Sequence, residues 1–404
     1  MIKSATGFAN QQCYYLGLMS GTSADGIDLA LVSFDEHSKP VHYASYYQAY
    51  CETTTAKITA LYNPDANEID RAFELDIELA TQFAKAINTF LAQEQLTSDD
   101  IIAIGSHGQT IRHRPRLNHP FTLQIGCCQT LATLTKIRVI GQFRRKDMAL
   151  GGQGAPLVPA FHRTIFSDCL HEDSKTFDTS SKNNCDVFVV NIGGIANLTF
   201  LPSTDKTSII GYDTGVGNAL MDDWFQLHHP ANNCSYDKSG HWAATGKVNT
   251  ALLTQLLADE YFDMPPPKST GREYFHLTWL KQQLSCIQTV ANQDVQATLT
   301  AFTAITIVNA IKQHSTDNSN TTKVYLCGGG AHNETLRNTI NQKLASENKG
   351  YELLSTSEKG IDGDQLEAIA FAWLAFCFDK NILSSMPAVT GASKACTLGT
   401  AFIP

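Results

Sequence analysis

Asp213 is the residue of this sequence best placed to exchange a proton with a ligand. It follows Ser208–Tyr212, an apolar segment typical of a β-strand, and precedes a Thr-Gly-Val-Gly-Asn turn and a helical pattern from Asn218 to His228. Glycines before a helix expose N–H groups that attract anions, and a carboxylate at a strand end can act as a general base. An aspartate that only closes a turn fits the same spacing, so both readings stay open.

A second candidate is the polar turn Ser20–Gly26, with the sequence Ser-Gly-Thr-Ser-Ala-Asp-Gly. It separates the apolar run Tyr14–Met19 from an alternating run that continues to Phe34, which predicts a β-hairpin. N–H groups and small hydroxyls in such a turn can receive phosphate oxygens. No lysine follows the second glycine, so this is not a Walker A loop, and a plain hairpin turn is the alternative.

Two further glycine-rich turns follow apolar runs. Gly193-Gly194 lies within Asp186–Phe200, with Asn197 close behind, and Gly328-Gly329-Gly330 follows the predicted strand Lys323–Cys327. Asn333 is the predicted N-cap of the next helix. Glycines allow a ligand to approach the backbone closely, but each turn also fits an ordinary connection.

A cluster of hydrogen-bond donors follows the short predicted strand Ile101–Ile104. It runs from Ser106 to Arg112 and contains His107 and Gln109. Such a cluster suits a polar, partly anionic ligand. The alternative is a solvated loop.

Asp364 and Glu367 are three residues apart at the start of a predicted helix, Gln365–Phe378. This spacing is typical of a capping box. A role for Glu367 in holding Mg²⁺ or positioning water is the alternative.

Strands and helices alternate along the chain, which predicts an α/β fold. The helical pattern over Glu68–Gln95 is the longest in the first half, and each half opens with a glycine-turned hairpin, which suggests a pseudo-duplicated architecture. We place one domain at residues 1–140 and the other at 141–404, with about 385–404 as a segment that returns to the first. Gly141–Pro159 is the predicted passage between them, and Asp168–Asn184 a polar surface excursion.

Composition narrows the class of protein. The 404 residues carry a net charge of −9, which argues against a nucleic-acid surface. The N-terminal sequence has no apolar signal region and no run of about 18 apolar residues stands out, so neither export nor a membrane span is expected. The 11 cysteines show no metal-binding spacing, which fits buried thiols in a reducing cytoplasm.

From Tyr14 to its C-terminus the chain resembles the bacterial anhydro-N-acetylmuramic acid kinases. The motifs that carry the resemblance occur in the family's order: LGLMSGTSADGIDLALV, GSHGQTIRHRP, GGQGAPLVPAFH, NIGGIANLTF, DTGVGNALMD, STGREYF, ATLTAFTA and CGGGAHNETL. The resemblance implies two related α/β domains of the actin, sugar kinase and heat-shock ATPase group, which close over a nucleotide cleft.

The resemblance also implies a reaction. Such an enzyme opens the 1,6-anhydro bridge of anhydro-N-acetylmuramic acid with water and phosphorylates O6 from ATP, with Mg²⁺ as cofactor. The products are N-acetylmuramic acid 6-phosphate and ADP, in cytoplasmic recycling of peptidoglycan. The expected partners are the sugar and ATP, with a homodimer but neither nucleic acid nor membrane.

The family's site residues transfer to positions already singled out. Asp213 matches the catalytic aspartate, while Glu367 is the predicted Mg²⁺ ligand from its place at a helix start and not from the resemblance. The ATP-phosphate loop matches Gly21, Thr22, Ser23, Ala24, Asp25, Gly26, Ile27 and Asp28. The other nucleotide-binding residues are Gly193, Gly194, Gly328, Gly329 and Gly330, and the predicted sugar-binding residues are His107, Gln109, Arg112 and Asn197, together with Asp213.

Two other classes of protein compete with this reading. One is another sugar or carboxylate kinase of the same fold, in which Asp213 would deprotonate a substrate hydroxyl. The other is a chaperone-type ATPase, which we expect to carry an appended peptide-binding domain that this sequence lacks.

Overall fold

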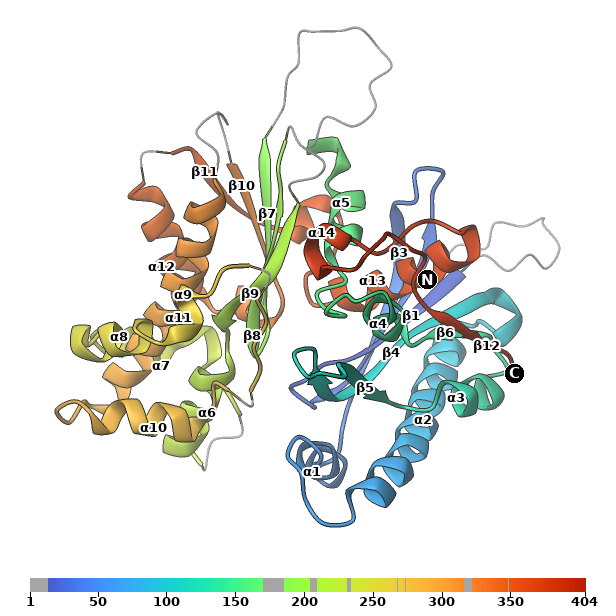
Figure 1. Cartoon of the computed structure of the whole chain (residues 1–404), viewed down its shortest axis with the longest axis horizontal. Helices are drawn as coiled ribbons and strands as arrows, with labels where there is room; N and C mark the ends of the chain where they lie inside the picture. Colours follow the sequence, from blue (N-terminus) through green and yellow to red (C-terminus); the bar gives the residue numbers. More distant parts are fainter. Residues whose placement is uncertain are drawn as a thin grey trace, which may run out of the picture. The chain divides into compact units, whose positions relative to one another are not determined.

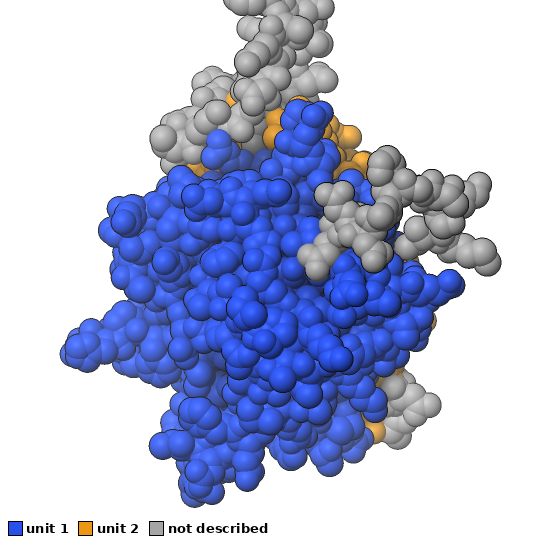
Figure 2. Space-filling view, turned by 90° about the vertical axis from the view of Figure 1, so that its right-hand side faces the viewer, with its two compact units in different colours: residues 1–165, 365–404 blue, residues 166–364 orange. Residues whose placement is uncertain are grey.

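The computed structural model describes residues 14–169, 185–203, 209–230, 234–266, 268–272, 274–315, 322–347 and 349–404. It divides into two compact units. Unit 1 joins residues 1–165 to 365–404, and unit 2 comprises 166–364. Unit 1 is blue in Figure 2. The residues before Tyr14 and most of the predicted excursion at 168–184 lie outside the described residues.

These boundaries correct the predicted division at 140/141. The segment Gly141–Pro159 is not a passage between halves, because it belongs to unit 1 and contains a helix, α4. The C-terminal return to unit 1 begins at Gln365 rather than near 385. The return starts early because α13 (Leu366–Lys380) packs on strands of the unit 1 sheet.

Unit 1 is built on a seven-stranded sheet with the order β12-β6-β4-β1-β2-β3, in which β5 pairs with β4. The hairpin predicted over Tyr14–Phe34 is confirmed, since β1 and β2 pair antiparallel. The strands are β1 (Tyr14–Ser20), β2 (Gly26–Phe34), β3 (Pro40–Ala49), β4 (Ile101–Arg114), β5 (Phe121–Ile125), β6 (Val139–Gly141) and β12 (Thr400–Phe402).

The predicted helix over 68–95 is confirmed as α2, which buries one apolar face that includes Leu79, Phe83 and Ile87. Figure 1 shows α3 beside α2. The helices of unit 1 are α1 (Glu52–Ala60), α2 (Glu68–Gln93), α3 (Cys128–Thr135), α4 (Phe143–Ala149), α5 (Pro159–Ile165), α13 (Leu366–Lys380) and α14 (Pro387–Thr390).

Helix α13 lies against the sheet at two glycines. A Cβ added at Gly17 of β1 would collide with the carbonyl oxygen of Ala368, and one at Gly105 of β4 would collide with that of Phe371. Because only glycine leaves this space, the helix backbone approaches both strands closely. The paired positions Gly17 and Gly105 are neighbours in the parallel β1–β4 register.

Unit 2 holds a five-stranded sheet with the order β11-β10-β7-β8-β9. Its strands are β7 (Asp186–Ile192), β8 (Ile195–Leu201), β9 (Ile210–Val216), β10 (Thr322–Cys327) and β11 (Tyr351–Ser355). Its helices are α6 (Ala219–His228), α7 (His241–Thr245), α8 (Thr250–Leu257), α9 (Glu260–Asp263), α10 (Leu277–Ser285), α11 (Asn292–His314) and α12 (Glu334–Ala345).

The two sheets repeat one topology. In unit 1 the antiparallel meander β1-β2-β3 is extended beyond β1 by the parallel strands β4 and β6. In unit 2 the meander β7-β8-β9 is extended beyond β7 by the parallel strands β10 and β11. The pseudo-duplication suggested by the two glycine-turned hairpins is therefore present in the strand order and directions.

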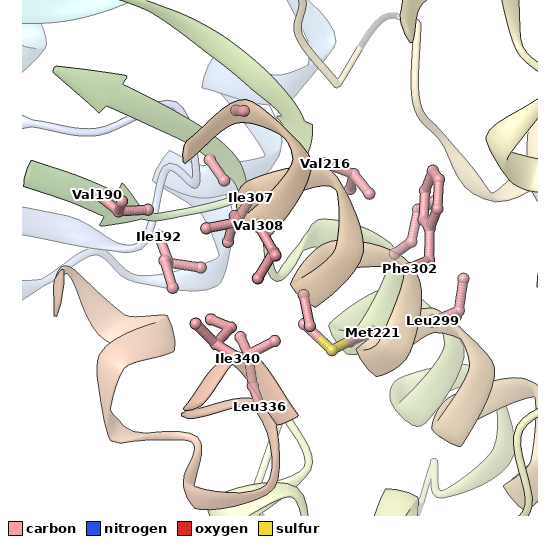
Figure 3. Close-up of a cluster of buried hydrophobic side chains, with 14 of the residues drawn as sticks. Val190, Ile192, Val216, Met221, Leu299, Phe302, Ile307, Val308, Leu336 and Ile340 are labelled. Carbon is pink, nitrogen blue, oxygen red and sulfur yellow. The ribbon is translucent and has the colours of Figure 1, made fainter. Parts of the chain in front are cut away.

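The core of unit 2 surrounds α11. Figure 3 shows Leu299, Phe302, Ile307 and Val308 of this helix among side chains from β7, β9, α6 and α12, and all of these side chains are buried. Among the described residues α11 alone has the length and mean hydropathy, 1.2, of a membrane span, but 83% of that window is buried inside the protein. Its apolar character is therefore that of a core helix.

Candidate active site

The predicted phosphate loop lies in unit 1 as the turn between β1 and β2. The Ala24 N–H closes the turn by donating to the Gly21 carbonyl over 3.1 Å, and Ala24 itself is buried. The exposed residues of the turn are Thr22, Ser23 and Asp25. The remaining predicted residues, Gly26, Ile27 and Asp28, belong to β2. Of the predicted phosphate loop, a ligand can therefore reach mainly the residues of the turn and not those of β2.

Protein donors hold the carbonyl oxygens of this turn. The donors are Gln109 Nε2 to Gly21 at 3.0 Å, Tyr62 OH to Thr22 at 2.8 Å, Thr55 Oγ1 to Ala24 at 2.9 Å and Tyr50 N–H to Asp25 at 2.9 Å. In a trans peptide the N–H points opposite to the C=O. The N–H groups of Thr22 and Ser23 therefore point away from these donors, an arrangement that suits a bound anion.

Gln109 anchors the turn from β4. Its side chain is fully buried, and its Oε1 accepts from Ser20 Oγ over 2.5 Å while its Nε2 donates to the Gly21 carbonyl. Ser20 Oγ also lies 2.8 Å from the hydroxyl of Tyr50. Both ends of the Gln109 amide thus bond within the protein, so its predicted contact with the sugar stays a prediction beside an observed anchoring role.

Replacing Gln109 with leucine is expected to lower the free energy of unfolding by about 2 kcal/mol, because Ser20 and the Gly21 carbonyl lose a buried partner. We expect the KM for ATP to rise more than the KM for the sugar, since the loosened element is the phosphate turn. Urea unfolding and initial-rate kinetics measure both effects. The exposed Gln93→Leu on α2 is the matched control, and a rise confined to the sugar KM would favour direct contact instead.

His107 is buried in β4, which runs through Gly105–Thr110 instead of ending before it. Its Nδ1–H donates to the Gly108 carbonyl over 2.8 Å, and its Nε2 accepts from Arg144 Nε over 3.0 Å. Burial, reinforced by the Arg144 charge, lowers the pKa of His107 to about 3. His107 is therefore a neutral acceptor that orients Arg144.

His107 makes the stability of unit 1 depend on pH. Its pKa in the folded protein is lowered to about 3, below the value of about 6.5 of an unfolded histidine. The unfolded chain therefore binds the proton first, so this contribution is complete above about pH 6.5 and is lost as the pH falls toward about 3. His107→Gln should reduce the slope of unfolding free energy against pH by about 1.4 kcal/mol per pH unit.

The measurement is urea unfolding of wild type and His107→Gln at several pH values between 6.5 and 4.5. His37→Gln serves as the control because His37 is exposed in the β2–β3 turn. Equal slopes for wild type and His107→Gln would contradict the assignment of a neutral buried His107.

Arg112 makes an ion pair with Glu68 at the start of α2, with Nη2 to Oε1 at 2.5 Å. Its Nε also donates to the carbonyl of Leu61 over 3.1 Å. The side chain thereby joins β4 to the segment between α1 and α2. Its predicted role toward the sugar is untested by these contacts, which leave part of the guanidinium edge for another acceptor.

Glu367 lies in the first turn of α13 and is half-buried. The predicted capping box is wrong, because the N-cap is Gln365 without a side-chain cap, and Asp364 instead pairs with His332 at 2.9 Å. Across the described ranges, no group of three or more His, Cys, Asp and Glu side chains could hold a metal ion. A single carboxylate fits a Mg²⁺ site in which substrate phosphates and waters supply further ligands.

In unit 2 the turn of Gly193 and Gly194 is joined to the start of α6. The Gly193 carbonyl accepts from the Asn218 N–H over 2.8 Å, and the Gly194 carbonyl from the Gly217 N–H over 2.9 Å. A Cβ at Gly217 would collide with the Gly193 carbonyl oxygen. Gly217 therefore permits a close backbone junction between the β7–β8 turn and α6.

The triple glycine packs on the same junction. Gly328 has a φ of 76°, and a Cβ there would collide with Asn191 Oδ1 at the end of β7. A Cβ at Gly330 would collide with Ile192, whose carbonyl also accepts from Asn218 Nδ2 over 3.3 Å. The structure thus brings together Gly193, Gly194, Gly328, Gly329 and Gly330, which lie far apart in the sequence.

Asp213 lies inside β9, which continues to Val216, so the predicted turn from 213 to 218 begins later than expected. Asp213 is the register partner of Asn197 on β8, and the next paired residue is Gly215 with Ala196. The extra residue, Thr214, makes a β-bulge, and bulges re-aim neighbouring side chains. The two predicted site residues Asp213 and Asn197 are therefore neighbours across a distorted strand pair.

Asp213 is held by a segment that the sequence reading gave no role. Its Oδ2 accepts from the Thr270 N–H over 3.0 Å, and its own N–H donates to the Lys268 carbonyl over 3.2 Å. Its carbonyl accepts from the Tyr261 hydroxyl over 2.6 Å. An N–H aimed at a carboxylate oxygen favours the charged form.

Sequence reasoning missed Tyr50, Tyr62, Tyr261 and Lys268 as supports of the candidate site. These residues donate hydrogen bonds to backbone carbonyl oxygens, and no local sequence pattern predicts such contacts. The only signal was the STGREYF motif, which begins next to Lys268.

The comparisons with known proteins match nearly the whole chain to one family. The family model described as anhydro-N-acetylmuramic acid kinase matches residues 13–404. The chain belongs to this family. An anhydro-N-acetylmuramic acid kinase of Colwellia psychrerythraea is 57% identical over 403 residues, covering 97% of each chain. One from Shewanella putrefaciens is 45% identical over 392 residues, covering 97% of this chain and 99% of that relative.

Among solved structures, the chain is similar to component A of the (R)-2-hydroxyglutaryl-CoA dehydratase of Acidaminococcus fermentans. The TM-score is 0.44 at 11% identity, with 89% of this chain and 96% of that chain covered. The α/β class predicted for this member of the anhydro-N-acetylmuramic acid kinase family is confirmed by its own two sheets and their helices.

Proposed function

We propose that this protein is an ATP-dependent kinase that opens 1,6-anhydro-N-acetylmuramic acid with water and phosphorylates O6, giving N-acetylmuramic acid 6-phosphate and ADP. The observation that carries the proposal is the family match over residues 13–404. It is supported by relatives named anhydro-N-acetylmuramic acid kinase at 57% and 45% identity. The reaction belongs to peptidoglycan recycling, for which the expected compartment is the cytoplasm.

Asp213 is the proposed general base. Its carboxylate takes a proton from water as the water oxygen attacks C1 of the sugar, the C1–O6 bond breaks, and O6 attacks the γ-phosphorus so that ADP leaves. General-base assistance is worth about 10²–10⁴ in rate. The Thr270 N–H on Asp213 Oδ2 supports this role, because it fixes one carboxylate oxygen and favours the charged form that accepts the proton.

The turn Gly21–Ser23 is the proposed receptor for ATP phosphate oxygens. Its support is the orientation of the peptide groups, whose carbonyls are held by Gln109 and Tyr62. Donors fixed before the reaction stabilise charge on the transferring group without reorganising. The Ser23 hydroxyl donates to Asp25 over 2.8 Å, so the backbone N–H groups are the better candidates than that hydroxyl.

Glu367 is the proposed protein ligand of Mg²⁺, or of a water bound to it. Bound there, Mg²⁺ would neutralise phosphate charge. The predicted nucleotide contacts of Gly193, Gly194 and Gly328–Gly330, and the sugar contacts of His107, Arg112 and Asn197, remain part of this proposal. A homodimer is likewise expected, and light scattering on the purified protein tests it.

The decisive test is a product analysis. Purified protein is incubated with ATP, Mg²⁺ and 1,6-anhydro-N-acetylmuramic acid in ¹⁸O water, and the product is examined by mass spectrometry. We expect one ¹⁸O on C1 and none in the phosphate. Label in phosphate would contradict the coupled mechanism. Phosphorylation of N-acetylmuramic acid or a common hexose in place of the anhydro-sugar would favour another sugar kinase of the same fold.

A further inference from the structure

Lys268 is a buried lysine beside the candidate base in unit 2. It is only 7% exposed, and lysine is almost never buried to this extent unless its ammonium group is paired. The Nζ donates to the carbonyls of Tyr261 over 3.0 Å and Phe262 over 3.3 Å, and lies 4.7 Å from the centroid of the Tyr261 ring. The ammonium group thus binds carbonyls of the short helix α9.

Lys268, Tyr261 and Asp213 form a closed triangle of contacts. The side chain of Lys268 binds the backbone of Tyr261, the side chain of Tyr261 binds the carbonyl of Asp213, and the N–H of Asp213 donates to the carbonyl of Lys268. Since each residue is bound to both others, displacement of any one of them strains its contacts with the other two.

The triangle also controls the carboxylate of Asp213. Thr270 follows Lys268 by two residues, and its N–H donates to Asp213 Oδ2 over 3.0 Å. A fixed Lys268 therefore limits where the Thr270 amide can lie. We call Lys268–Thr270 the strap, because it binds Asp213 through both the backbone N–H and a carboxylate oxygen.

Burial of an ammonium group opposes folding, and it lowers the pKa of Lys268. The hydrogen-bond acceptors of Lys268 are carbonyl oxygens, and the charge of the nearby Asp263 offsets only part of the effect of burial on its pKa. Because burying this ammonium group costs folding free energy, stability does not explain a lysine at this position. Placement of the Asp213 carboxylate explains it better, since Lys268 contacts the neighbours of Asp213.

We infer that Lys268 is a positioning residue that sets the orientation of the Asp213 carboxylate through the strap and Tyr261. The inference rests on the proposed function, in which Asp213 is the base. It predicts an effect on kcat, because a misplaced base slows the chemical step, while binding of ATP is unaffected. A small displacement of a reacting group can cost about 100-fold in rate.

The test compares Lys268→Met with Lys281→Met, an exposed lysine of α10 in the same unit. We expect kcat of folded Lys268→Met to fall about 10- to 100-fold, with an unchanged KM for ATP and normal kinetics for Lys281→Met. In an Asp213→Asn background the same Lys268→Met substitution should cause no further fall, because the carboxylate it orients is absent. Thermal melting of each variant reports whether it is folded.

Wild-type kcat in folded Lys268→Met would overturn the inference, and so would an equal further fall in the Asp213→Asn background. If Lys268→Met does not fold, Tyr261→Phe removes only the hydroxyl contact to Asp213, and its kcat should fall about 3- to 10-fold; wild-type kcat there overturns the inference. Turnover that survives Asp213→Asn would instead remove the base role itself, so the two failures are distinguishable.

Discussion

Replacing Asp213 with asparagine is expected to lower kcat by about 10²–10⁴-fold, the range attributed to a general base. Asparagine keeps the volume of the side chain and can still accept the Thr270 N–H, so the backbone contacts to Lys268 and Tyr261 should survive. What it cannot do is take a proton from water. The change therefore removes the chemistry while it leaves the fold and ATP binding in place.

The measurement is initial-rate kinetics with the anhydro-sugar, beside ATP binding by calorimetry and thermal melting. Glu352→Gln is a matched control, since Glu352 is an exposed carboxylate of β11 in the same unit and makes none of the contacts to Asp213 described above. Turnover within about tenfold of wild type in a folded Asp213→Asn protein would contradict the base role, because such a loss lies below the range expected of general-base catalysis.

Replacing Gly105 with alanine is expected to lower the free energy of unfolding of unit 1 by about 3 kcal/mol, the upper part of the range for overpacking. The new methyl group would overlap the Phe371 carbonyl oxygen of α13. Backbone cannot swing aside as a side chain can, so either the helix moves away from β4 or the strand bends. Both movements expose apolar side chains of α13, which is buried along most of its length.

Hydrogen exchange of the α13 amides measures this effect locally, and urea unfolding measures it globally. The control is Gly329→Ala, where the nearest atom to the new Cβ is 3.9 Å away and φ is not in the left-handed region. Loss of α13 protection in Gly105→Ala but not in the control is the expected pattern. Equal protection in both variants would contradict the close packing of α13 on the sheet.

Elements with strong local signals could be predicted from the sequence. The glycine-turned hairpins and the long helices follow from alternating or helical apolar spacing, and both appear with nearly the predicted bounds. Asn333 also caps α12 as predicted, accepting from the Leu336 N–H over 3.0 Å. In each of these cases, the residues that determine the element lie within one or two turns of it.

Elements with buried polar residues could not be predicted in this way. β4 was expected to end at Ile104, because Ser106, His107 and Gln109 read as a loop, yet all three are buried within the strand. The side chains of Gln109 and His107 replace water with hydrogen bonds to residues far away in the sequence: Gln109 bonds to Ser20, and His107 to Arg144. β3 was also not predicted. Its side chains alternate between half-buried and exposed, so the strand has no fully buried apolar face to mark it in the sequence.

The residues of the candidate site also fall into those that a local sequence signal reveals and those that it does not. Asp213 and the glycines could be proposed from the sequence because a reactive or unusually small residue stands out there. Lys268 and Tyr261 were not, because their contacts join three segments through carbonyl oxygens, and nothing in their spacing shows it. The capping box at Asp364 failed similarly, because its carboxylate pairs instead with His332.

The division of the chain into two units also determines the order in which the units can complete their folding during synthesis. Unit 2 is continuous from residue 166 to 364, so all of its strands are synthesised before α13. Unit 1 must wait, since Gly17 and Gly105 face a helix that begins at Leu366. The half of the protein that is translated first is therefore the half that finishes folding last, and until then the apolar side chains of its sheet need shielding from other chains.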